Sequence, residues 1–503
     1  MDNRNSPNLQ ANIRNFIFPV VAVLLTALAA GTGWGIRGQF GHETGAMIAG
    51  ALASLTLVML FVPQATSLAG ARAAAMMTVA IGVGGSMTYG QTIGLTHDKE
   101  LHGHWEAFRW GMAGLFMKGS IWIGFGGVFL GMGLGGKRYS VLEILALVLG
   151  MVGMMFLGTS LINSPFEPTT KTLPAIYFSD SWYFEPGADL KPRSEMWGGL
   201  LVALGGLIAY VRFLRGDRLA ARMALVGVIA GGLGFPLAQA VQASHAWNPE
   251  LYSTGALSWS YDFTQHFNWW NMMETTFGAI WGGGLALGLW FNRHLITVDT
   301  PRGTHDTTDV VTLSPTVEVL LCVTHTILLL TAEFGSLPGR VELFMLYSEF
   351  GLVMIALPLV GIVGGRYWPY LLLLPMVIAP VAGKTLRLVS YSMDSVPVGI
   401  GWFVFLAIPL AITLVVATWL IGRSIQEQRA GLFSAIALVV TGWLFYSLNT
   451  AVFDYAWPWK EWTHRTPNQL IFTVSITALT LTALCCQPSI TSSNKQKGER
   501  TNH

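Results

Sequence analysis

Long apolar stretches alternate with short polar ones along most of the chain. A helix needs about 20 apolar residues to cross a bilayer, and about fourteen stretches reach that length. They lie near 15–36, 43–63, 71–95, 106–133, 140–162, 195–214, 219–243, 271–291, 317–336, 341–363, 367–388, 398–421, 430–450 and 467–487. The pattern predicts an all-α, polytopic integral membrane protein with about 14 transmembrane helices.

One local pattern recurs in the amino-terminal half: an apolar helix, a glycine-rich tip with polar residues, and a second apolar helix that begins near a glutamate. The clearest copy spans 31–52, and weaker copies lie at 85–106, 153–195 and 234–274. The glutamates are Glu43, Glu106, Glu195 and Glu274. Fixed self-similarity of this kind predicts a fold built from repeated helical hairpins.

Composition supports the membrane class. Of the 503 residues, 52% are hydrophobic and only 11% are charged, whereas soluble domains are about 25% charged. The 57 glycines suit close helix approach in lipid. A net charge of +2 gives no basic face for nucleic acid. The cysteines, Cys322, Cys485 and Cys486, predict neither a disulfide framework nor a zinc site.

Charge in the loops predicts the orientation. If Arg4 and Arg14 are cytoplasmic, more than half of the 29 Lys and Arg residues fall on the same side, mostly in short loops. This is the distribution that the positive-inside rule describes. We therefore expect both termini in the cytoplasm, the hairpin tips outside, and a multi-pass protein of the inner (cytoplasmic) membrane.

The chain divides into four predicted parts. A first bundle with the four hairpins covers 1–292, and a Thr-, Asp- and Pro-rich cytoplasmic linker covers 293–316. A second bundle of three plainer hairpins covers 317–487, and a polar tail predicted to be disordered covers 488–503.

The first tip concentrates polar chemistry, with Arg37, Gln39, His42 and Glu43 inside seven residues. Ionisable groups within a bilayer cost several kcal/mol, so they tend to pair and to face a cavity. In one interpretation Arg37 holds an anionic or polyhydroxylated solute while His42 and Glu43 exchange a proton. In the other, Glu43 is a helix-start carboxylate favoured by the helix dipole and Arg37 is its partner.

The second tip carries Gln91, Glu106 and Arg109, with histidines at 97, 102 and 104. These histidines and the nearby carboxylates allow a metal site, but their spacing is not that of a closed site. A solvated loop is the favoured interpretation, and we expect neither a metal nor a cofactor. Lys118 lies about three turns further along the same helix.

Gln239, Gln242 and His245 share one helix face at three-residue spacing, and we expect that face to complete a polar pocket with the first tip. The predicted substrate-binding residues are Arg37, Gln39, His42, Glu43, Gln91, Glu106, Arg109, Gln239, Gln242, His245, Asn271 and Glu274. The candidates for ion coupling are Glu43, Lys118, His325 and Glu333. For His325, a satisfied buried histidine is the alternative.

Aromatic residues crowd the predicted outer loops at 176–185, 245–271 and 454–465. Interfacial belts of Trp and Tyr are general in membrane proteins, but 19 tryptophans exceed what a belt needs. Aromatic faces beside carboxylates and amides also suit sugars. A sugar or another polyhydroxylated solute is therefore the favoured ligand class.

Nucleotide, zinc-protease, redox and serine-hydrolase motifs are absent from the sequence. We expect a secondary transporter, a symporter that moves a small polar solute with a proton or sodium ion and contacts membrane lipid, rather than an enzyme. The alternatives are a membrane enzyme acting on glycans or lipid-linked sugars at the outer face, and a non-catalytic subunit of a membrane complex. A transporter requires Lys118 and His325 to border a cavity, whereas such an enzyme requires an outer vestibule with a groove for a lipid tail.

Overall fold

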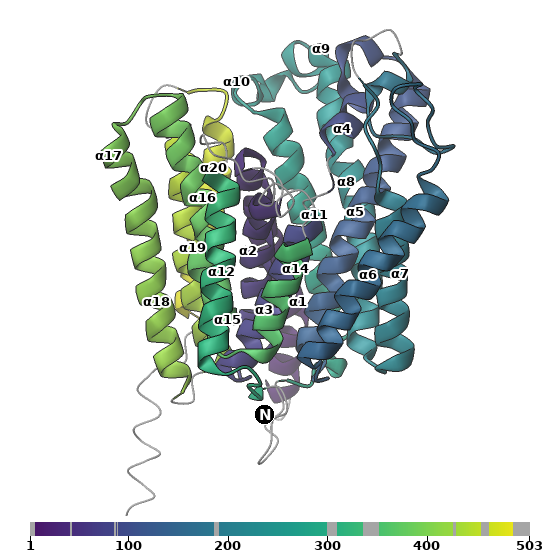
Figure 1. The fold of residues 1–503 in the computed structure, drawn as a ribbon. Helices are drawn as coiled ribbons and strands as arrows, with labels where there is room; N and C mark the ends of the chain where they lie inside the picture. The colour runs from purple at the N-terminus through teal and green to yellow at the C-terminus, as the bar shows by residue number, and fades with distance from the viewer. Residues whose placement is uncertain are drawn as a thin grey trace, which may run out of the picture.

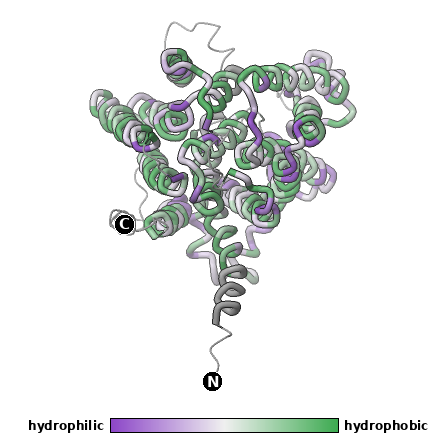
Figure 2. The backbone as a smooth tube through the Cα atoms, turned by 90° about the horizontal axis from the view of Figure 1, so that it is seen from below, coloured by the Kyte–Doolittle hydropathy of each residue, from purple (hydrophilic) through white to green (hydrophobic). Residues whose placement is uncertain are grey.

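The computed structural model describes residues 6–40, 43–84, 87, 89–185, 191–298, 309–334, 352–425, 429–453 and 462–485. Within these ranges the regular structure is helical, apart from two isolated β-bridges. The long helices run side by side in one bundle (Figure 1). In a view along the bundle, most of the backbone is coloured as hydrophobic (Figure 2). The all-α prediction is confirmed.

The first half of the chain forms nine longer helices or helix pieces and two short ones. They are α1 (Ser6–Phe40), α2 (Glu43–Phe61), α3 (Ser67–Gly84), α4 (Gly90–His97), α5 (Trp105–Leu134), α6 (Val141–Ile162), α7 (Trp197–Ala209), α8 (Arg218–Trp247), α9 (Pro249–Ser253), α10 (Tyr261–Thr264) and α11 (Trp269–Phe291). A π-helical segment, Tyr210–Leu214, continues α7.

The second half forms α12 (Pro315–Phe334), α14 (Leu352–Gly364), α15 (Trp368–Leu371), α16 (Val377–Leu386), α17 (Val398–Gly401), α18 (Ile408–Ser424), α19 (Ala430–Val452) and α20 (Thr466–Cys485). π-Helical segments at Leu372–Met376, Arg387–Ser392 and Trp402–Ala407 join pieces of the same spans. Helix α19 packs on α2 and α3, and α20 packs on α1. The division into two bundles stays a prediction.

Eleven helices among the described residues are long and apolar enough to cross a membrane, so the chain has the build of a multi-pass membrane protein. Helix α11 is long enough but is not among the eleven, because it carries Asn271 and Glu274. The single helix expected over 71–95 is wrong: α3 ends at Gly84 and α4 begins at Gly90.

Glycines place the tightest helix pairs in contact. Helix α5 packs extensively on α8, and α1 packs extensively on α11. A Cβ on Gly119 would overlap the carbonyl of Gly231 on α8, and a Cβ on Gly278 would overlap the carbonyl of Ala30 on α1. Small residues let backbones approach to this distance, which gives the van der Waals contact that holds helices together in lipid.

The loops predicted to share one side gather at one end of the bundle, near the start of α1 (Figure 1). Arg72 donates to the carbonyl of Gly365 at 2.8 Å, and Arg222 donates to Asn292 at 3.1 Å. Arg429 forms an isolated bridge with Thr66. Helices α4, α9 and α10 lie at the opposite end, which we call the outer end.

Helix α6 has two different faces. Ile144 and Val148 are buried, whereas Leu142, Leu149 and Leu161 are among its exposed residues. Exposed leucines on a helix of this hydropathy are typical of a surface that meets lipid. The outward face of α6 therefore borders the membrane, and its inward face is available for packing.

Candidate functional site

The interruption between α3 and α4 positions the most polar site of the first half. Helix α3 ends against the middle of α5, where the indole of Trp122 donates to the carbonyl of Ile81 at 2.7 Å. A Cβ on Gly84 would overlap that indole, so only glycine lets α3 end there. Non-helical backbone at membrane depth is tolerated where protein covers it.

Three polar side chains from distant parts of the chain meet beside this interruption; we call them the triad. Arg37 comes from the last turn of α1, Tyr89 directly precedes α4, and Glu274 lies in the second turn of α11. Arg37 donates to the Tyr89 hydroxyl, which donates to Glu274. The Arg37 Nη1 lies 3.6 Å from the Glu274 Oε1, and all three residues are buried.

Aromatic rings enclose the triad. The Arg37 guanidinium carbon lies 5.3 Å from the ring centres of both Trp34 and Trp122, a range at which a cation is attracted to a π face. Trp270 donates to Glu274 at 3.3 Å. A Cβ on Gly38 would overlap the Glu274 carboxylate. The triad is therefore a filled site, in which aromatic and polar groups together replace water.

Other predicted binding residues lie around the triad without joining it. Asn271 is buried and donates to the carbonyl of Gly35. Gln239 is buried and donates to Thr96 of α4 at 2.7 Å. Gln242 is buried on the same helix. The His245 ring stacks on Trp269 with ring centres 4.0 Å apart.

The remaining predicted residues are not gathered at the triad. Glu106 and Arg109 are exposed at the start of α5, and Gln39 and Gln91 are half-buried. His42 lies outside the described residues, as do the side chains of Glu43 and Glu333, although α2 begins at Glu43 and α12 includes Glu333. His325 is buried in the second half, with its ring 5.5 Å from that of Trp368. Across the described residues, no three His, Cys, Asp or Glu side chains are placed to hold a metal ion.

A second charged cluster lies on the α5 side of the interruption. Lys118 is buried and donates to Thr92 of α4 at 2.7 Å. Glu195, two residues before α7, is also buried, and its Oε1 accepts from the backbone N–H of Phe178 at 3.1 Å. Its Oε2 is buried and makes no hydrogen bond of normal geometry within the described ranges, although the indole of Trp197 lies close enough to stabilise the carboxylate. Lys118 and Glu195 are close enough to interact electrostatically.

Burial sets the charge state of the carboxylates outside the membrane spans. Desolvation raises the pKa of Glu195 to about 7, although the positive charge of Lys118 opposes the rise. Desolvation also raises the pKa of Asp180, which accepts hydrogen bonds from Tyr177 at 3.1 Å and from the backbone of Trp182 at 3.0 Å. Glu195 is therefore a group that can change its charge near neutral pH.

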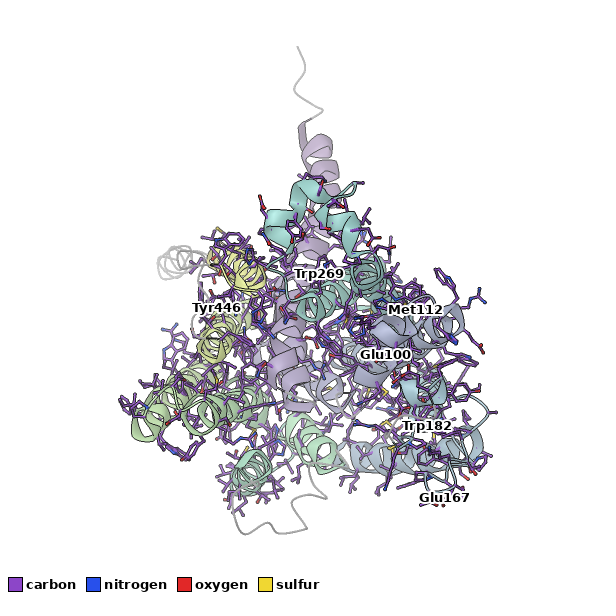
Figure 3. All side chains as sticks on the ribbon, turned by 90° about the horizontal axis from the view of Figure 1, so that it is seen from above. Glu100, Met112, Glu167, Trp182, Trp269 and Tyr446 are labelled. Carbon is purple, nitrogen blue, oxygen red and sulfur yellow. The ribbon has the colours of Figure 1, made fainter. Side chains whose placement is uncertain are left out.

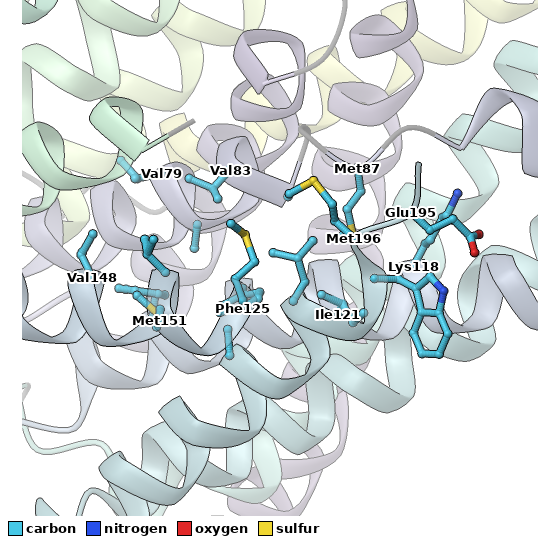
Figure 4. A pocket seen from close by; sticks show the side chains of 18 of the residues that line it. Val79, Val83, Met87, Lys118, Ile121, Phe125, Val148, Met151, Glu195 and Met196 are labelled. Atoms are coloured by element: carbon cyan, nitrogen blue, oxygen red, sulfur yellow. The ribbon is translucent and has the colours of Figure 1, made fainter. Parts of the chain in front are cut away.

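Lys118 and Glu195 close one end of a cavity between α3, α5, α6 and α7 (Figure 4). Val148 and Met151 of α6 lie at the opposite end. Met87, from the interruption between α3 and α4, also lines the cavity. The interruption therefore contributes Met87 to the cavity lining and Tyr89 to the triad.

The outer loop before α7 covers this end of the molecule. Thr92 donates to the carbonyl of Phe178 at 3.0 Å, which fixes the loop to α4. Viewed from the outer end, Trp182 lies over the side formed by α6 and α7, whereas Trp269 lies nearer the middle of the bundle (Figure 3). The loop that contains Trp182 is therefore part of the packed structure, whereas Trp259 in the loop before α11 is exposed.

Two residues of these sites were absent from the predicted set. Tyr89 lies within the second glycine-rich tip, and Glu195 opens the second helix of the third hairpin. The repeat pattern marked Glu195 as a counterpart of Glu43, but it did not single out Tyr89. Their partners, however, come from other hairpins, and the repeat contains no information on those pairings.

No family model, curated protein or solved structure matches this chain. Its function is therefore inferred from the arrangement of its own residues.

Proposed function

We propose that the chain is a cation-coupled secondary transporter that moves a small polar solute, such as a sugar, across the cytoplasmic membrane. The observation that carries the proposal is the interrupted α3–α4 helix with buried charges beside it. In many transporters, discontinuous helices near mid-membrane form the sites for substrate and coupling ion. The proposal includes about 14 spans in repeated hairpins, with both termini in the cytoplasm.

Glu274 is the coupling group in this proposal. Its carboxylate balances the positive charge of Arg37 and accepts the Tyr89 hydrogen bond. Protonation of Glu274 would leave Arg37 buried without its counter-charge, which is costly in a dry site. A change in the charge of one residue would thereby favour a rearrangement of α1, α4 and α11.

The solute class follows from the groups around the triad. Trp34, Trp122 and Trp270 pack around Arg37 and Glu274 in this structure, and in the proposal a solute meets these rings and the donors of Arg37 and Asn271 once the triad opens. This combination suits a hydroxyl-rich solute with apolar ring faces. The exposed positions of Glu106 and Arg109 favour transport over outer-face catalysis, because an acid and a base must lie within hydrogen-bond reach of one substrate.

Reconstitution into proteoliposomes tests the proposal. Sugars and polyols are offered under an imposed proton gradient and, separately, a sodium gradient. Accumulation of one solute is expected, and Glu274→Gln should abolish accumulation while leaving downhill exchange of the same solute. Glu250→Gln, which changes an exposed carboxylate outside the predicted set, is the matched control. The proposal fails if no solute accumulates under either gradient, or if Glu274→Gln accumulates it as the unmodified protein does.

A further inference from the structure

The cavity closed by Lys118 and Glu195 is long and follows the helix axes. Lys118, Ile121, Phe125 and Phe129 line it from one face of α5. At a rise of 1.5 Å per residue, this stripe extends about 16 Å. The hydrocarbon core of a bilayer is about 30 Å thick. The cavity is therefore about as long as one leaflet is deep.

The lining is apolar along most of that length and polar at one end only. Met151 and Met155 of α6 and Val79 of α3 line the apolar part. Methionine side chains are flexible and adapt to irregular apolar partners. With a volume of about 210 Å³, the cavity has room for more than a few waters, yet its apolar walls offer waters few partners. An aliphatic chain suits these walls better.

The polar end presents two opposite charges. Lys118 and Glu195 both line the cavity there, and they lie together at that end in Figure 4. Buried carboxylate oxygens almost always accept a hydrogen bond, but the Glu195 Oε2 accepts none of normal geometry from the described residues, and the nearby Trp197 indole is a poorly placed donor. A donor that enters the cavity could therefore bind this oxygen. A purely anionic head would be repelled by Glu195, and a purely cationic head would be repelled by Lys118.

We propose that this cavity binds one amphipathic molecule with a zwitterionic head, its ammonium group on Glu195, its anionic group beside Lys118 and its aliphatic tail along α5. The site is separate from the Arg37–Tyr89–Glu274 triad. It goes beyond the proposed transport function, because it holds whether or not the triad couples solute to an ion.

Native mass spectrometry of the full-length protein in detergent tests this site, with a single-chain lysophosphatidylethanolamine as the probe. Val152→Trp fills the cavity from α6, and Leu149→Trp places the same side chain on the exposed face of the same helix. Glu195→Gln removes the head partner, and Glu106→Gln is its exposed control. Ala203→Phe fills the cavity from α7 and replaces Val152→Trp if that variant is not monodisperse.

The unmodified protein should retain one probe molecule. Either filling variant should lose it, and Glu195→Gln should bind it at least tenfold more weakly, while Leu149→Trp and Glu106→Gln stay within twofold of the unmodified protein. A lysolipid with an anionic glycerol head should bind more weakly, and the head without a tail should not compete. Equal retention by the filled variants overturns the site. Equal binding of both lysolipids, or no effect of Glu195→Gln, overturns the assignment of the head.

Discussion

Two buried charged sites lie on either side of the interruption between α3 and α4, and they differ in what surrounds them. The triad pairs Arg37 with Glu274 through Tyr89, beside the rings of Trp34 and Trp122. The other site pairs Lys118 with Glu195 at the end of a cavity, where one carboxylate oxygen makes no hydrogen bond of normal geometry to the described residues. Both sites pair a buried cation with a buried carboxylate. The triad is closely packed, whereas the Lys118–Glu195 pair borders a cavity large enough for a ligand.

The largest expected loss of stability comes from removing one of the two charges of the triad. Arg37→Met or Glu274→Leu leaves the other charge buried and unpaired, which costs about 3–5 kcal/mol of unfolding free energy. The double variant should be less destabilised than the sum of the two singles, because it removes both charges. Denaturant unfolding in detergent measures all three. A double variant that loses the full sum would show that the two charges do not stabilise each other.

Larger side chains should destabilise the closely packed α1–α11 contact more than the Lys118–Glu195 cavity. Gly278→Leu forces a side chain into the carbonyl of Ala30 between α11 and α1, and overpacking of this kind costs about 1–3 kcal/mol. Ala203→Leu places the same side chain at the cavity wall and should leave stability unchanged or slightly raised. Melting temperatures in detergent provide the comparison. Equal losses in both variants would mean that the cavity has no spare room.

The pH should change lysolipid binding at the Lys118–Glu195 cavity. Because burial raises the pKa of Glu195 to about 7, this carboxyl is charged above that pH and neutral below it. The charged groups that face it are Lys118 and Asp180. Binding of the zwitterionic lysolipid should therefore weaken about tenfold from pH 8.5 to 5.5, or about 1.4 kcal/mol. Titrations at both pH values should show a flat profile for Glu195→Gln; an equally steep profile in that variant would assign the effect to another group.

The smallest expected effect belongs to the amides on α8. Gln239→Leu removes one hydrogen bond to Thr96, and Thr96 still donates to the carbonyl of Ile93 at 2.7 Å. The loss should be about 0.5–1.5 kcal/mol. Gln242→Leu should be nearly neutral, because its Oε1 is buried and accepts no hydrogen bond from the described residues. Denaturant unfolding curves of the two variants show which substitution costs more stability. A larger loss for Gln242→Leu would place an unseen donor beside it.

The sequence predicted the helices well because lipid imposes a minimum length of apolar residues on each span. It did not predict the interruption within 71–95, although α4 is less hydrophobic than α3. That interruption depends on tertiary contacts: Gly84 meets Trp122, and Tyr89 meets Arg37 and Glu274. Such contacts join helices that are far apart in the chain.

The candidate site was predicted in part. The polar tips identified Arg37 and Glu274 individually, but nothing local in the sequence shows that α1 packs against α11 and brings these residues together. The apolar lining of the cavity could not be predicted either. Residues such as Phe125 and Met151 have the same hydropathy whether they pack against each other or border an open space. Only the arrangement of α3, α5, α6 and α7 separates the two cases.

The brevity of α4 has a consequence for biogenesis. Its eight residues extend about 12 Å, which is less than half of the hydrocarbon thickness, so the nascent chain cannot settle this piece in lipid by itself. It packs against α5 and α8, and α8 leaves the ribosome long after α4 does. Helix α4 should therefore remain near the translocon or the outer surface until α8 is made, so that this crossing is completed late in synthesis.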